Sequence, residues 1–177
     1  MRAEAQAFVE SLYDEQRSAA SYDFTDQERH RWQYTPGPRN GLPLADLEPP
    51  QRERAMGLVD AALSTRGAET ARGIMALEPI LGSLEEEEGR PGFERRDAEA
   101  YWFSVFADPA SADVWGWRLG GHHLCLHFTV VGEDVAVTPL FFGANPARVP
   151  SGPMQGTRLL AAEEDLARAL VRGLDDE

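Results

Sequence analysis

Residues 114–131 read VWGWRLGGHHLCLHFTVV, and this segment carries the strongest structural signal in the sequence. Two runs that favour strands, Val114 to Leu119 and His122 to Val131, flank the pair Gly120-Gly121. Adjacent glycines allow the positive φ angles of a two-residue hairpin turn. The pattern therefore predicts two antiparallel strands joined at Gly120-Gly121.

The register of this hairpin assigns its side chains to two faces, because strand side chains alternate. With Gly120-Gly121 as the loop, Trp117 lies opposite Leu124, and the face rich in Trp, Leu and Phe is the core side. Gly116 then lies opposite Cys125, which leaves space beside the thiol for a ligand or another backbone.

Further elements are expected on both sides of the hairpin. Strands at 101–106 and 135–138 extend it to an antiparallel meander, and 31–34 is a candidate short strand. Helical spacing predicts helices over 3–20, from about 49 to 67, over about 68–84 and over 161–174. Pro79 should kink or break the third helix, and the last should turn Leu166, Ala169 and Leu170 inward. We therefore expect an α+β fold, with helices packed on a small antiparallel β-meander.

The length of 177 residues favours one domain spanning 1–177. A charged linker at 85–92, EEEEGRPG, separates a helical half (about 1–88) from a strand-rich half with a C-terminal helix (about 93–177).

Composition excludes several function classes. All 17 basic residues are arginine, so there is no lysine for Schiff-base chemistry or for a phosphate-binding loop. The single cysteine, Cys125, excludes an intrachain disulfide framework and multi-cysteine zinc sites. A net charge of -13 disfavours binding to nucleic acid and to anionic membranes. With no signal-peptide pattern and no apolar run of about 18 residues, we expect a cytoplasmic protein.

Three of the four histidines and the only thiol lie within 122–127. In the predicted strand, His123, Cys125 and His127 share one face beside Arg118. Imidazole and thiolate are ligands for Zn, Cu, Fe or Mn, so this face is a candidate metal site. Alternate strand positions lie about 6.6–7 Å apart, so two of these residues, completed by Glu78 or another carboxylate, fit one ion better than three. The alternative interpretation is that these residues simply form the polar face of a half-buried sheet.

Other roles remain open for single residues. His122, on the predicted core side, is either a hydrogen-bonded core histidine or a buried functional group. Cys125 can act as a nucleophile if a neighbouring histidine serves as its base and Arg118 favours the thiolate. Glu78 precedes Pro79 and either points inward as an acid, base or ligand, or lies on the helix surface.

Several short motifs resemble an uncharacterised bacterial family, domain of unknown function 3500. They are RWQYTP (31–36), RNGL (39–42), IMALE (74–78), WGWR (115–118), GHHL (121–124) and GANPA (143–147). The resemblance runs from about Glu28 to Arg172 and implies little about activity. Members usually continue into a second half with an Asn-His-Ile-His segment, so this chain resembles the first half only. They more often carry Ser and Asn in place of Cys125 and His127, which implies that His122 and His123 are the better carriers of a shared site.

Two functions follow as hypotheses. The first is a metal-dependent enzyme or metal-binding protein, with Arg118 as an anion contact and Glu78 as an acid, base or ligand. Its predicted metal ligands are His122, His123, Cys125 and His127. The second is a non-catalytic interaction module that forms a homo-oligomer or binds a protein partner, since its sheet edges are otherwise uncovered.

Overall fold

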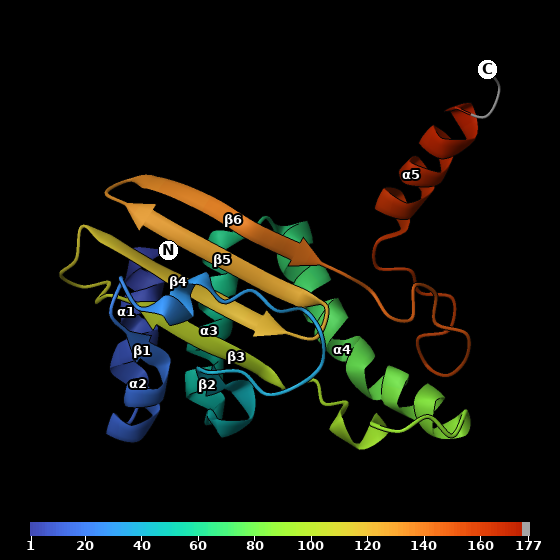
Figure 1. The fold of residues 1–177 in the computed structure, drawn as a ribbon. Helices are drawn as coiled ribbons and strands as arrows, with labels where there is room; N and C mark the ends of the chain where they lie inside the picture. Colours follow the sequence, from blue (N-terminus) through green and yellow to red (C-terminus); the bar gives the residue numbers. More distant parts are fainter. Residues whose placement is uncertain (175–177) are drawn as a thin grey trace.

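The computed structural model describes residues 1–174, and within them helices cover one face of a six-stranded, mostly antiparallel sheet (Figure 1). The α+β class predicted from the sequence is confirmed. The strands are β1 (Ser21–Tyr22), β2 (Leu42–Pro43), β3 (Tyr101–Phe106), β4 (Val114–Gly121), β5 (Leu124–Val131) and β6 (Asp134–Phe142). The helices are α1 (Arg2–Ser11), α2 (Asp14–Ala20), α3 (Pro49–Ala62), α4 (Thr65–Glu87) and α5 (Ala161–Leu174), with short 3-10 turns η1 (Gln27–His30), η2 (Leu44–Asp46) and η3 (Phe93–Arg95). The sheet order is β1-β3-β4-β5-β6, and β2 pairs with β3.

The single N-terminal helix predicted over 3–20 is wrong, because the chain breaks it into α1 and α2. Leu12 and Tyr13 are extended at the junction. The Tyr13 N–H donates to Gln16 Oε1 at 3.0 Å, which starts a new helix through a side-chain cap. The strand predicted at 31–34 is also absent, since these residues form an irregular segment.

The second and third helices differ from the prediction at their boundaries. Ser64 Oγ accepts the Gly67 N–H at 3.2 Å, so α4 begins at Thr65 and includes the predicted stop at Arg66-Gly67. The helix also continues through Pro79 to Glu87 without a break. The predicted linker therefore starts too early, because Glu85 is a buried helical residue.

The hairpin turn lies two residues later in the chain than predicted. Gly121 pairs with Leu124 inside the sheet, so the loop is His122-His123 and not Gly120-Gly121. A Cβ on Gly121 would lie 2.0 Å from the Tyr101 ring, so a glycine is needed within the strand for that ring to pack. As a result His122 and His123 occupy the turn and do not alternate along a strand, and His123 adopts a φ of 59°.

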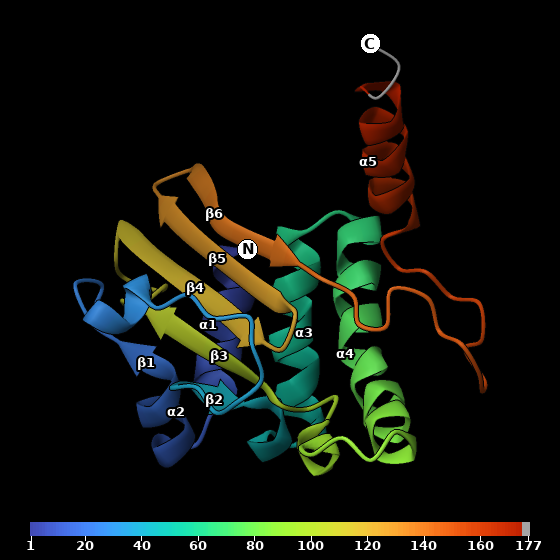
Figure 2. The same cartoon turned by 45° about the vertical axis from the view of Figure 1, so that its right-hand side comes forward.

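The core lies between the sheet and the helices. Trp117 stacks on Phe128 with ring centroids 4.6 Å apart, and Leu119 and Leu126 are fully buried beside them. This confirms the predicted core side of the hairpin. The opposite sheet face, which carries Arg118, is crossed by the irregular segment around η1 (Figure 2).

The last strand and the last helix lie at the margin of the molecule. β6 continues through Pro139, beyond the predicted 135–138, at the edge of the sheet where a proline is tolerated. α5 has the predicted bounds, and its first turn meets α4 through an ion pair between Glu163 and Arg66. The remainder of the helix projects away from the sheet (Figures 1 and 2). Leu166 and Leu170 are 71% and 67% exposed, so the inward packing predicted for them and Ala169 is wrong. No helix among residues 1–174 is both long and apolar enough to cross a membrane.

Candidate functional site

The β4–β5 turn brings His122 against Glu78 on α4. Glu78 Oε1 lies 2.5 Å from His122 Nδ1, and the two side chains are only 6% and 9% exposed. A carboxylate this close to an imidazole nitrogen, shielded from water, forms a strong charge-assisted hydrogen bond. Two residues that the sequence singled out for separate reasons therefore form one buried pair.

Arg96 and Glu85 extend this pair into a chain of alternating charges. The Arg96 guanidinium donates to both Glu85 oxygens, at 2.8 and 2.7 Å, and its Nη1 lies 3.6 Å from Glu78 Oε2. The hydrogen bond from Arg96 holds the pKa of Glu85 below its usual value, and the same bond raises the pKa of Arg96. Glu78 therefore remains beside a fixed positive charge.

The hydrogen-bond roles at His122 Nδ1 follow from its two neighbours. Arg96 Nη1 lies 3.1 Å from Nδ1 and can only donate, whereas Glu78 is the closer group and accepts. One ring nitrogen cannot donate to Glu78 and accept from Arg96 at once. Two acceptor atoms 2.5 Å apart need a proton between them, so we assign Nδ1–H as the donor to Glu78. Nε2 then carries the lone pair, and it forms no hydrogen bond within residues 1–174.

Neighbouring residues fix the His122 backbone. The Tyr101 hydroxyl donates to the His122 carbonyl oxygen at 2.9 Å, and burial raises the pKa of that hydroxyl, so it stays a donor. On α4, a Cβ at Gly82 would lie 3.0 Å from the Arg96 Cβ. The small residue at this position lets the Arg96 segment approach the helix closely.

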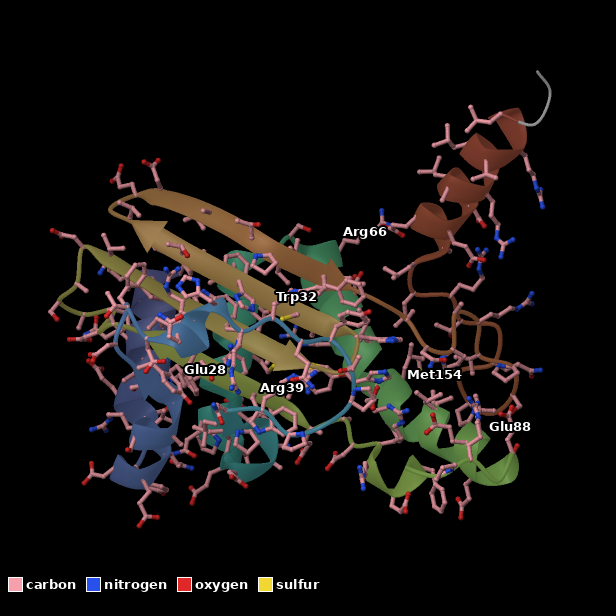
Figure 3. The ribbon with its side chains drawn as sticks, viewed as in Figure 1. Glu28, Trp32, Arg39, Arg66, Glu88 and Met154 are labelled. Carbon is pink, nitrogen blue, oxygen red and sulfur yellow. The ribbon has the colours of Figure 1, made fainter. Side chains whose placement is uncertain are left out.

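A cavity of about 190 Å³ opens beside the Glu78–His122 pair. Its walls include both members of the pair and residues from three other segments: Pro36, Gly37, Pro38, Arg39, Arg95, Ala100 and Trp102. Figure 3 shows Arg39, with Glu28 and Trp32, on the segment that crosses the sheet. Arg39 donates to the carbonyl oxygens of Thr35 and Gly121 at 2.7 and 2.9 Å, and its guanidinium lies 5.6 Å from the Trp102 ring centroid.

Comparison with protein families assigns the chain to one family. The family model described as "Protein of unknown function (DUF3500)" matches residues 1–177. The chain belongs to the DUF3500 family. The match covers the whole chain, beyond the region from Glu28 to Arg172 that the motifs indicated. No curated protein and no solved structure matches this DUF3500 chain.

His123, the next predicted metal ligand of this DUF3500 chain, lies beside His122 with ring centroids 4.0 Å apart. Burial lowers the pKa of His123 to about 4, with a further contribution from the neighbouring His122. Its Nδ1 is buried without a hydrogen-bond partner among the described residues. Its main chain bonds to Tyr34 and Gly143 on either side, so the turn is held in place.

Cys125 and His127 lie on the same face of the sheet as Arg118, which pairs with His127 across β4 and β5. Burial raises the pKa of the Cys125 thiol, which disfavours the thiolate that a nucleophile requires. Burial lowers the pKa of His127 to about 4, and its Nε2 is buried without a partner among the described residues. The four predicted ligands do not form one centre, because residues 1–174 contain no group of three or more His, Cys, Asp or Glu placed to hold a metal.

Arg118, predicted as an anion contact, forms a buried ion pair with Glu28, with Nη2 and Oε1 2.7 Å apart. Its other hydrogen bonds go to the main-chain oxygens of Glu28, Arg31 and Asn40 and to Ser104 Oγ. This side chain therefore fastens the crossing segment to the sheet, and its donors are directed at protein groups.

Sequence reasoning missed Arg96, Tyr101 and the cavity role of Arg39. Arg39 belongs to the RNGL motif that carried the family resemblance, so that motif could have drawn attention to it. Arg96 lies in a polar stretch with no distinguishing pattern. The packing of its segment against Gly82 and its ion pair with Glu85 bring it to the site.

Proposed function

We propose that this DUF3500 protein is an enzyme that uses acid–base catalysis, with His122 as the proton-transferring group and Glu78 as its positioning carboxylate. The observation that carries the proposal is the 2.5 Å contact between Glu78 Oε1 and His122 Nδ1, in a buried pair beside a cavity. Buried pairs of titratable groups in clefts are typical of functional sites.

The arrangement supports a defined division of labour. Glu78 holds the ring in the tautomer that leaves Nε2 able to accept a proton, and its charge stabilises the imidazolium that then forms. Arg96, paired with Glu85, places a fixed positive charge beside Glu78. The described residues lining the cavity include no Ser, Thr, Cys or Lys nucleophile, which favours direct proton transfer to or from water or substrate.

The test is turnover of a panel of small esters, amides and carbon acids by the purified full chain. His122→Asn should lower kcat/KM by about 10²- to 10⁴-fold, the usual contribution of a general acid or base. Glu78→Gln should lower it less, because an amide oxygen still accepts from Nδ1–H. His30→Asn, at an exposed position on η1, is the matched control and should keep full activity. Wild-type turnover that His122→Asn retains would contradict the proposal.

A bound divalent transition metal (Zn, Cu, Fe or Mn) is a second candidate, favoured by the same contact. A carboxylate on one imidazole nitrogen leaves the other for a metal, and such pairs are common at metal centres. His122 and His123 would be the protein ligands. Water or substrate would have to complete the coordination, given the absence of a larger ligand cluster in residues 1–174. Elemental analysis of native protein should then find stoichiometric metal that His122→Asn loses. No metal, with a Tm unchanged by zinc or chelator, would remove this candidate.

The interaction-module hypothesis rests on a different part of the molecule. α5 exposes an apolar row of Leu166, Leu170, Val171 and Leu174, between 59% and 71% exposed. Exposed contiguous apolar surface is typical of protein contacts. We propose a second copy of the chain as the partner, because the acidic first turn and basic last turn of α5 suit an antiparallel pair of identical helices.

A further inference from the structure

The cavity beside His122 has an excess of positive charge. Arg39 and Arg95 line it, and Arg96 lies behind Glu78. Among these three arginines, Arg96 is paired with two carboxylates, Glu78 and Glu85. Three guanidinium groups against two carboxylates leave one positive charge, in a protein whose net charge is -13.

That charge resides on the two lining arginines. Arg39 donates to main-chain carbonyl oxygens, which fix its position but do not neutralise it. Arg95 is exposed at the cavity wall and forms no side-chain hydrogen bond or ion pair within residues 1–174. A guanidinium with unused donors presents a planar fork that matches the two oxygens of a carboxylate.

The remaining walls are apolar. Trp102 offers an indole ring, and Pro36, Pro38 and Ala100 complete that side. A cavity of about 190 Å³ is smaller than the usual ligand site of roughly 300–1,000 Å³. An occupant should therefore be small, with a flat apolar part for the indole and an anionic group for the arginines.

We propose that this cavity binds a small monoanionic carboxylate, with its carboxylate on Arg95, its flat apolar part against Trp102 and its reacting hydrogen near His122 Nε2. The inference rests on the proposed function for the identity of the reacting group, but the recognition itself depends on Arg95 and Trp102. A single excess positive charge favours a monoanion over a phosphate dianion.

The experiment titrates the full chain with benzoate, phenyl phosphate and benzyl alcohol, using calorimetry for affinity and NMR for location. Benzoate should bind saturably and shift the Trp102 indole signal, with benzyl alcohol at least tenfold weaker. Arg95→Gln should weaken benzoate binding at least fivefold. Arg90→Gln, a nearby exposed arginine paired with Glu88, is the matched control and should leave binding unchanged.

Three results would overturn the proposal: no saturable benzoate binding, an affinity insensitive to Arg95→Gln, or tighter binding of phenyl phosphate than of benzoate. His122→Asn separates this proposal from the acid–base function, since it should lose turnover and keep benzoate binding. If His122→Asn loses turnover but the wild type does not bind benzoate, only the carboxylate-binding proposal is overturned. Benzoate binding together with full turnover in that variant overturns the acid–base function alone.

Discussion

At the scale of single residues, the molecule holds three histidines of the β4–β5 region in different environments. His122 bonds to a carboxylate, whereas His123 and His127 each have a buried nitrogen with no partner among residues 1–174. Burial without a counter-charge disfavours an imidazolium, which explains the pKa of about 4 for both. Of these three histidines, only His122 lies in contact with a carboxylate.

His127 should make stability fall in mild acid. Its folded pKa of about 4 lies below the ordinary 6.5, so between these values the unfolded chain binds a proton that the folded chain does not. Stability should therefore drop as pH falls from 6.5 towards 4, by up to about 3 kcal/mol at about 1.4 kcal/mol per pH unit.

Denaturant unfolding across this range, comparing wild type with His127→Asn, measures the effect. The variant should show the shallower pH dependence, and His30→Asn should keep the steep one. Equal slopes for wild type and His127→Asn would show that His127 does not carry this effect.

At the scale of elements, the hairpin and α4 together build the site. β4 and β5 place the turn over α4, and Tyr101 on the adjacent β3 bonds to the His122 carbonyl oxygen. This arrangement depends on Gly121, which faces the Tyr101 ring across the strand pair. The position of His122 therefore depends on the packing of β3 against β4 as well as on the contact of its own side chain with Glu78.

Gly121→Ala should disturb the site and the fold together. Its Cβ would overlap the Tyr101 ring, and overpacking of this kind costs about 1–3 kcal/mol. We expect a lower Tm and a shifted NMR signal for His122. Gly173→Ala on α5, where a Cβ meets nothing within 4 Å, is the matched control and should leave both unchanged. A Gly121→Ala protein with wild-type Tm would contradict the packing argument.

Elements with strong local patterns were predictable, and those set by distant contacts were not. The two-residue alternation located the β4–β5 hairpin, and the bounds of α5 matched the prediction. The turn residues were misplaced because the Tyr101 ring, and not turn propensity, decides where Gly121 belongs. Likewise Glu78 and His122 were each noticed, but their contact joins positions 44 residues apart and no local pattern indicates it.

At the scale of the whole molecule, the site and the exposed helix are separate features. The Glu78–His122 cavity lies where α4, the hairpin turn and the crossing segment meet. α5 projects away from this cavity beyond its contact with α4 at Arg66 (Figure 2), and its apolar row is exposed. Catalysis and self-association are therefore independent proposals, and each can fail without the other.

Self-association should be visible in multi-angle light scattering of the full chain. If α5 pairs with its copy, wild type should show twice the monomer mass, and Leu166→Ser with Leu170→Ser should restore the monomer. Ala167→Ser, at a neighbouring exposed position of α5, is the matched control and should remain dimeric. A wild-type monomer at all concentrations would exclude this pairing.

The tautomer of His122 is decisive for the proposed acid–base role, because proton transfer at Nε2 requires the proton of the neutral ring to be on Nδ1. Long-range ¹H–¹⁵N NMR of the full chain distinguishes the two ring nitrogens by their shifts. We predict Nδ1–H bonded to Glu78 and an unprotonated Nε2 in the neutral ring, with the Nδ1–H signal altered in Glu78→Gln. A neutral His122 protonated on Nε2, with Nδ1 accepting from Arg96, would rule out this role for His122.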